Sequence, residues 1–260
     1  MNLFDCHLHS DFSFDSSENM ENYIKKVQKN GDKYFITTEH MDLESNFNHT
    51  DIIPNFDLQQ KKINELSQKY DMNILFGIEV GWRSDIHKRN MEIVRKYPFD
   101  MVILSIHESN EFDVSFPEFR QNKTTDECYN EYLELAYNAV SAFDDFDTFA
   151  HIDYVLRYIG NTDLSKHKEM LRKIFSVLIE KDKALEINTK LVPQPDAMAR
   201  IEYIIRLYTS MGGKKVTIGS DAHYVKAHKN GFEETIELLK KYGIDHAYVF
   251  IGRKGIKIKI

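Results

Sequence analysis

The segment DCHLHSDFSFDS, residues 5–16, places two histidines, His7 and His9, among several acidic side chains. Residues i and i+2 of an extended strand point to the same side. His7 and His9 can therefore bind one metal ion together, while Cys6 and Leu8 point the other way into packing. Two histidines do not complete a metal site. The fold must therefore bring other side chains to the end of this first strand.

Short apolar runs alternate with longer amphipathic runs along the rest of the chain. This alternation predicts strands joined by helices, with Val- and Ile-rich strands buried in a parallel sheet. The expected strands are 3–9, 33–40, 73–80, 100–107, 148–153, 184–190, 215–223 and 247–252, and the expected helices are 18–31, 57–70, 85–97, 124–143, 165–182, 196–213 and 232–243.

About seven such repeats in a chain of 260 residues favour a distorted (β/α)7 barrel of the TIM type. The metal site would then lie at the C-terminal ends of the strands. An open, doubly wound sheet is the alternative, but no GxGxxG motif follows the first strand to support a dinucleotide fold. We see no linker or repeat, and therefore expect residues 1–260 to form a single domain.

Composition excludes several classes of protein. Hydrophobic residues make up 42% of the chain, which is typical of a folded protein, and the net charge of −7 disfavours binding to nucleic acid. No run of about 18 apolar residues predicts a membrane span. The chain start lacks a signal-peptide pattern, so we expect a cytoplasmic protein with Cys6 and Cys128 as free thiols. The oligomeric state is open.

Polar side chains end nearly every expected strand. Each such histidine, taken alone, is more often a packed or hydrogen-bonded residue than a ligand. Their repetition, with Glu79 and Asp221 at equivalent positions, instead favours one shared metal centre. In a parallel barrel the C-terminal ends of the strands meet at one face. The candidate ligands are His7, His9, Asp15, His40, Glu79, His107, His151, Asp221 and His223.

These nine side chains exceed what one ion needs. A tetrahedral ion takes four ligands, and a catalytic ion often takes three and a water. We therefore expect two or three divalent ions, with some side chains in supporting positions. Imidazole and carboxylate ligands suit zinc, iron and manganese, and the sequence does not choose among them.

Six motifs, in order, resemble those of the PHP family, the polymerase and histidinol phosphatase superfamily. They are DCHLHSDFSFD, TTEH, GIEVGW, SIH, AHID and GSDAH, and they span nearly the whole chain. The segments GIEV, HIDYVLRY and EINT look most like the monofunctional histidinol-phosphate phosphatases. The resemblance implies a distorted barrel with a trinuclear centre. By motif, His7, His9, Glu79 and Asp221 would hold one ion, Glu79, His107 and His151 a second, and Asp15, His40 and His223 a third.

The expected reaction is hydrolysis of a small phosphate monoester, L-histidinol phosphate, by a metal-bound hydroxide. Arg157 is the first candidate for binding the phosphate, because a guanidinium can bind it at two points. Arg83 and Lys190 are further candidates. Asp221 or a metal-bound water would protonate the leaving group. Acidic side chains that could select the cationic substrate are Asp42, Glu44 and Glu108.

Three other functions remain as alternatives. A PHP phosphoesterase could act on nucleotides or other small phosphate esters. A non-catalytic accessory module is disfavoured by the complete ligand set. A metal-dependent amidohydrolase would share the HxH motif but normally uses other later motifs, whereas here Glu79 occupies the bridging position.

Overall fold

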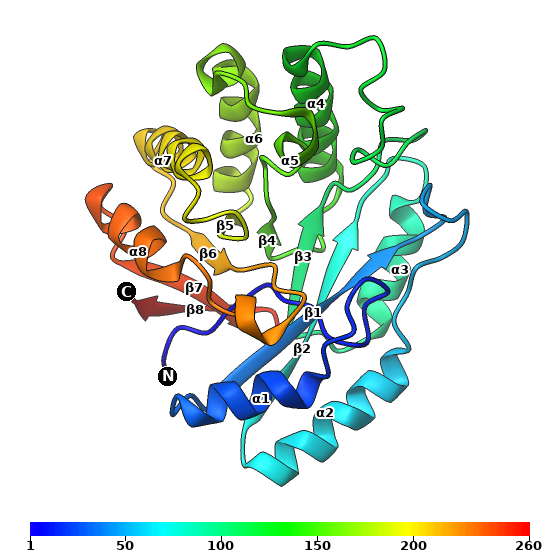
Figure 1. The fold of residues 1–260 in the computed structure, drawn as a ribbon, viewed down its shortest axis with the longest axis vertical. Coiled ribbons are helices and arrows are strands. Elements are labelled where there is room, and N and C mark those ends of the chain that lie inside the picture. The colour runs from blue at the N-terminus through cyan, green and yellow to red at the C-terminus, as the bar shows by residue number, and fades with distance from the viewer.

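The computed structural model describes residues 1–260 and is built around six parallel strands (Figure 1). The strands pair in sequence order, each with the next. This order, with a helix after each strand, is that of a barrel wall. The strands are β1 (Tyr34–Asp42), β2 (Asn73–Gly81), β3 (Met101–Ser105), β4 (Thr148–Phe149), β5 (Ala184–Asn188) and β6 (Val216–Gly219).

The helices cover the outside of this wall, and their apolar faces join the strands in a core of 59 buried side chains. All seven expected helices are present. For example, Thr124 and Glu127 form a capping box that starts the long helix α4. The helices are α1 (Met20–Lys29), α2 (Phe56–Tyr70), α3 (His87–Lys96), α4 (Thr125–Ala142), α5 (Leu156–Ile159), α6 (Lys168–Glu180), α7 (Pro195–Ser210) and α8 (Phe232–Lys241), with 3-10 turns η1 (Leu164–His167) and η2 (Val225–Ala227).

The N-terminal segment lies between the two edges of the sheet. The backbone N–H of Cys6 donates to the carbonyl of Ile218 on β6 (3.1 Å), and the N–H of Thr38 on β1 donates to the carbonyl of Leu8 (2.9 Å). The segment makes only one regular bridge, between Leu8 and Ala222. It therefore takes the place of a seventh strand without being one. The barrel prediction is confirmed, and the open doubly wound alternative is wrong.

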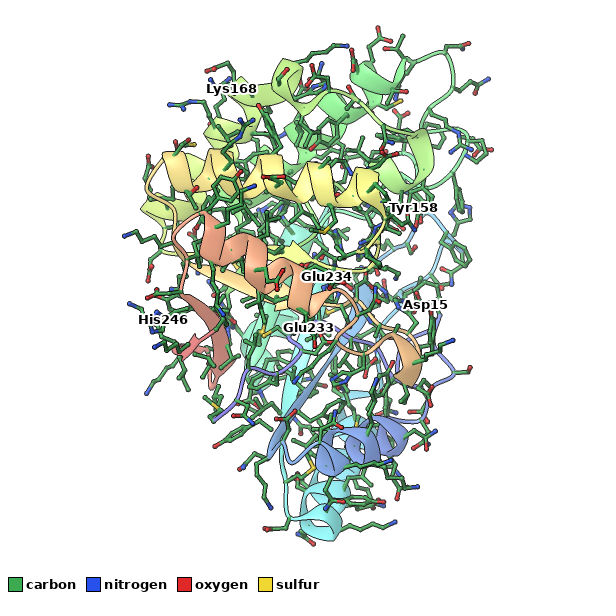
Figure 2. All side chains as sticks on the ribbon, turned by 60° about the vertical axis from the view of Figure 1, so that its left-hand side comes forward. Asp15, Tyr158, Lys168, Glu233, Glu234 and His246 are labelled. Atoms are coloured by element: carbon green, nitrogen blue, oxygen red, sulfur yellow. The ribbon has the colours of Figure 1, made fainter.

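The C-terminal segment differs from the prediction of a last barrel strand. β7 (His246–Ile251) pairs antiparallel with β8 (Lys254–Lys259) in a separate hairpin. Phe250 and Ile258 from this hairpin pack against Ile36 and Met101, which lie early in their strands. The hairpin thus covers the end of the barrel where the strands begin. Figure 2 places His246 on the side of the molecule opposite Asp15 and Tyr158.

Two further expectations concern the chain as a whole. None of the helices combines the length and apolar character that a membrane crossing requires. Cys6 and Cys128 are both buried and unpaired. Cys6 packs in the apolar cluster beneath the barrel, as its position next to His7, on the opposite side of the extended segment, predicts.

Candidate metal centre

Glu79 lies at the centre of the candidate site. It is fully buried on β2, and the register of the sheet sets it beside His40 of β1. Five imidazoles have a ring nitrogen within 3.4 Å of its carboxylate oxygens. The distances to Glu79 are 3.2 Å for His7, 3.4 Å for His9, 3.0 Å for His40, 3.1 Å for His107 and 2.9 Å for His151.

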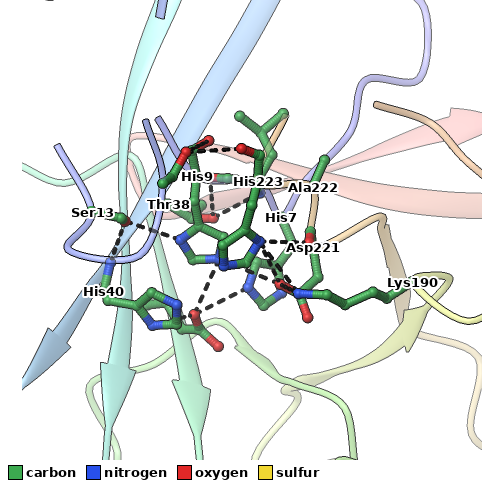
Figure 3. Close-up of polar contacts among 12 residues, drawn as sticks. His7, His9, Ser13, Thr38, His40, Lys190, Asp221, Ala222 and His223 are labelled. Atoms are coloured by element: carbon green, nitrogen blue, oxygen red, sulfur yellow. Dashed lines mark hydrogen bonds and ion pairs between the residues drawn. The ribbon is translucent and has the colours of Figure 1, made fainter. Parts of the chain in front are cut away.

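A second group of ligands lies beside the first, and Figure 3 shows His9, His40, Asp221 and His223 close together. Asp15 Oδ2 is 2.8 Å from His223 Nε2 and 3.4 Å from His40 Nε2. Ring nitrogens of His9, His40 and His223 lie within 4.8 Å of one another. Asp221 Oδ1 is 3.6 Å from His9 Nε2. All nine candidate ligands therefore gather at one end of the barrel.

Unsatisfied polar atoms show that this cluster fits divalent metal ions. A buried polar atom without a hydrogen-bond partner is costly, so native proteins rarely keep several together. Imidazole nitrogens and carboxylates are suitable ligands for zinc, iron or manganese, and an ion would satisfy them. The buried atoms without a hydrogen-bond partner include His7 Nε2, His9 Nε2, His40 Nδ1, Glu79 Oε2 and His151 Nδ1.

Attraction between the buried carboxylates and the neighbouring basic side chains dominates the electrostatics of the cluster. Burial favours the neutral form of Glu79, but the neighbouring His7 and His40 hold its pKa well below the usual range. Burial likewise opposes ionisation of Asp221, yet Lys190 and Arg157 keep its pKa well below the usual range. The buried carboxylates thus stay charged.

A layer of hydrogen bonds behind the ligands fixes three of the imidazoles. His7 Nδ1 lies 2.6 Å from Glu186 Oε1, and His107 Nδ1 lies 2.8 Å from Asp42 Oδ1. His9 Nδ1 is 3.1 Å from Ser13 Oγ. Such partners set which nitrogen carries the proton and which one is free to bind metal. Gly81 leaves room for Asp42 to contact His107, since a Cβ at residue 81 would lie 1.8 Å from Asp42 Oδ1.

The sequence analysis did not identify Glu186 or Glu39 as part of this layer. Glu39 is fully buried and accepts hydrogen bonds from Ser10 and Ser13. Glu186 could have been found by the same i, i+2 rule that pairs His7 with His9, because it stands two residues before Asn188 on β5.

Two of the substrate candidates lie beside the metal ligands. Arg157 Nη1 donates to Asp221 Oδ2 and Nη2 donates to Asn188 Oδ1, both at 2.9 Å. Lys190 Nζ donates to Asp221 Oδ1 at 2.9 Å. These two cations thus occupy one flank of the centre, next to a cavity of about 350 Å³ that Lys190, Asp221 and His223 help to line.

The other substrate candidates have partners of their own. Arg83 pairs with Asp85 (3.0 Å) and with Glu108 (2.9 Å) and is 6% exposed. Glu44 forms an ion pair with Arg89. Asp42 points into the barrel, toward His107, and not toward the rim. In this arrangement these side chains stabilise loops and ligands.

This chain is similar to known proteins over its whole length. Residues 5–190 match the PHP domain family. A histidinol-phosphatase from Lactococcus lactis subsp. lactis is 32% identical, covering all of this chain and 98% of its own. A probable histidinol-phosphatase from Thermotoga maritima is 31% identical over 99% of this chain and all of its own.

Solved structures share the fold. The crystal structure of histidinol phosphate phosphatase from Lactococcus lactis, in complex with zinc, L-histidinol and phosphate, superposes with a TM-score of 0.90 at 32% identity, over 97% of this chain and 98% of its own. A Listeria monocytogenes structure with 21% identity and a TM-score of 0.74 shares the fold over 88% of this chain and 98% of its own. The motifs, the barrel and the clustered ligands agree with these matches: the chain belongs to the PHP domain family.

Proposed function

We propose that this protein is a histidinol-phosphatase that hydrolyses L-histidinol phosphate to L-histidinol and phosphate. The observation that carries the proposal is the full-length similarity to the Lactococcus enzyme, whose structure holds zinc, L-histidinol and phosphate. The complete cluster of nine ligands at the mouth of this barrel supports an active enzyme.

We propose three ions, held in three groups of side chains. His7, His9 and Asp221 have donor atoms within 4.8 Å of one another and would hold the first ion with Glu79. Glu79 Oε1 lies close to both His107 and His151, which would hold the second. Asp15, His40 and His223 would hold the third. When bound, such ions activate water and neutralise phosphoryl oxygens. We propose zinc, with iron and manganese as the other ions to test.

Arg157 and Lys190 are the proposed phosphate-binding side chains. Arg157 is held from behind by Asp221 and Asn188, which leaves further N–H groups of its guanidinium to donate. Lys190 supplies a second, more flexible positive charge on the same flank. Together they would orient the phosphate with one face toward the metal ligands.

Asp221 is the proposed residue for moving the proton that the leaving oxygen requires: as a charged carboxylate it would first accept a proton from the attacking water and then pass it to the leaving oxygen. Its Oδ1 faces His9, His223 and Lys190, whereas its Oδ2 faces Arg157. It is the one carboxylate in the cluster that contacts both proposed phosphate-binding cations. Its position therefore connects the metal ligands to the side of the site where the ester would lie.

An aromatic rim suits the imidazole of the substrate. Phe14 is 53% exposed, and its ring centre lies 5.6 Å from that of His40 and 5.7 Å from that of Phe47. Exposed apolar rings beside a binding site commonly mark ligand contacts. We propose that these rings contact the histidinol part of the ester.

A phosphate-release assay on metal-loaded protein tests the proposal, with L-histidinol phosphate compared against nucleotides and sugar phosphates. We expect kcat/KM for L-histidinol phosphate to exceed that of every other ester by at least about a hundredfold. Equal or faster turnover of nucleotides would keep the phosphatase chemistry and overturn the substrate assignment.

A further inference from the structure

Glu186 on β5 contacts three separate parts of the site. Its Oε1 lies 2.6 Å from His7 Nδ1, while its Oε2 accepts from the backbone N–H of His151 (3.0 Å) and from Asn188 Nδ2 (3.1 Å). Glu186 is 2% exposed, so water does not compete for these bonds. His7 and Glu186 both lie close to the backbone of Gly219: a Cβ at residue 219 would lie 2.4 Å from His7 Cβ and 2.5 Å from Glu186 Oε1.

The hydrogen bonds around Asn188 have a fixed direction. Its Oδ1 accepts from Arg157 Nη2 (2.9 Å) and from the backbone N–H of Lys190 (3.1 Å). Both of those groups can only donate, so the amide must turn its NH2 toward Glu186. A continuous series of bonds therefore runs from Arg157 through Asn188 to Glu186, where His7 also donates.

We propose that Glu186 is a positioning residue that couples the metal centre to the phosphate-binding arginine. By accepting from His7 Nδ1 it keeps Nε2 unprotonated and aimed at Glu79 and the metal. Through Asn188 it sets the orientation of Arg157. It also holds the backbone of His151, which has an uncommon positive φ of 22°. The phosphate half of this inference rests on the proposed function, whereas the metal half does not.

Glutamine has nearly the same shape but cannot make the same bonds. If its NH2 faces His151 N–H and Asn188 Nδ2, donors face donors. If its NH2 faces His7 Nδ1, that nitrogen must accept, and the proton moves to Nε2, the atom needed for the metal. In the first orientation of the Glu186→Gln amide the bonds from His151 and Asn188 are lost, and in the second the metal-binding nitrogen of His7 is blocked. The volume of the side chain is nearly unchanged in both.

Two variants and a control separate these roles. Glu186→Gln disturbs either the bond to His7 or the bonds to His151 and Asn188, according to how its amide is oriented, whereas Asn188→Ala removes the link to Arg157 and the bond from the Lys190 backbone and leaves His7 in place. Asp147→Asn is the control, because Asp147 is also buried and accepts from Val102 N–H and Arg253. It lies where β3 and β4 begin, away from the metal ligands. The measurements are zinc affinity by chelator competition, the visible spectrum of the cobalt-substituted protein, and competitive inhibition by inorganic phosphate, with thermal unfolding monitored for each variant.

The orientation with the NH2 toward His7 keeps the bonds from His151 and Asn188, so we expect Glu186→Gln to adopt it, to bind zinc about 10- to 100-fold more weakly and to change the cobalt spectrum. Asn188→Ala should raise the inhibition constant for phosphate by roughly tenfold, with zinc affinity unchanged. Asp147→Asn should change stability alone. Wild-type zinc affinity and a wild-type cobalt spectrum in Glu186→Gln would overturn the inference. Unchanged phosphate inhibition in Asn188→Ala would also overturn it, and this second test still applies if Glu186→Gln does not fold.

The zinc and cobalt measurements also separate this inference from the proposed substrate. If the wild-type protein binds metal but does not release phosphate from L-histidinol phosphate, the substrate assignment fails. A weakened metal site in Glu186→Gln would still support the positioning role of Glu186 in that case.

Discussion

The two ends of the barrel interior differ sharply although the same strands build both. Along β1, Ile36 and His40 point to the same side of the strand, yet Ile36 packs in the apolar cluster and His40 faces Glu79. β3 likewise runs from Met101 at its start to His107 just beyond its end. The interior is thus apolar where the strands begin and polar where they end.

The hairpin makes this difference possible. Phe250 and Ile258 cover the apolar end, and Arg253 fixes the hairpin by its ion pair with Asp147. Because this end is closed by packing, the open end can hold a cluster of buried charges that contributes little to folding by itself. We therefore expect substitutions at the two ends to affect different properties.

Removing the central carboxylate should have the largest effect on activity. Glu79→Gln keeps the side-chain volume but removes the charge that five histidines surround. We expect at least about a thousandfold loss of kcat/KM and loss of metal on purification. Steady-state kinetics and elemental analysis measure both. Full metal content with near-normal kinetics would contradict the central role of Glu79 in binding the metal ions.

Phe250→Ala tests the closed end. Phe250 is 3% exposed and packs against the apolar end of the barrel, so loss of its ring should lower the free energy of unfolding by about 3–5 kcal/mol. Chemical denaturation measures this value. The kcat of the folded variant should stay close to that of the wild type. A large fall in kcat without loss of stability would mean that the two ends are not separate.

Arg157→Lys should affect substrate binding more than folding. Lysine keeps the charge but loses the two-point geometry, so we expect KM to rise about tenfold. Arg200→Lys is the matched control, because Arg200 is a similarly buried arginine paired with Asp153 and Asn161. Equal changes of KM in both variants would show that the effect of Arg157 is structural.

Phe14→Ala should have the smallest effect. More than half of this side chain is exposed, so its removal should leave the melting temperature nearly unchanged. We expect KM for L-histidinol phosphate to rise about two- to fivefold. Leu58→Ala, at an equally exposed position on α2, should change neither quantity. An unchanged KM for Phe14→Ala would exclude the aromatic rim from substrate binding.

The sequence predicts the helices and the starts of the six barrel strands because their periodicity is local, whereas most of the strands end at other residues than expected. The convergence of His7, His40 and Glu79 follows from parallel strands alone. The partners of polar side chains were harder to foresee. Asp42 and Glu108 have the composition of rim acids, but they face His107 and Arg83, which come from other strands and loops. Only the register of the sheet decides such pairs.

The hairpin was missed for a related reason. Gly252 and Arg253 form its two-residue turn, and both have positive φ, at 54° and 64°. Turns of this kind usually carry Asn-Gly or Asp-Gly, so an arginine in the second position gives no turn signal. The ion pair of Arg253 with Asp147, about 100 residues away in sequence, helps to hold the conformation.

Metal removal tests the central claim most directly. The protein is treated with a chelator, its fold is checked by circular dichroism, and phosphate release from L-histidinol phosphate is measured before and after zinc, iron or manganese is returned. We predict a folded but inactive protein that regains activity with two or three ions bound per chain. Sustained turnover by the metal-free protein, or full metal loading without turnover, would contradict the account.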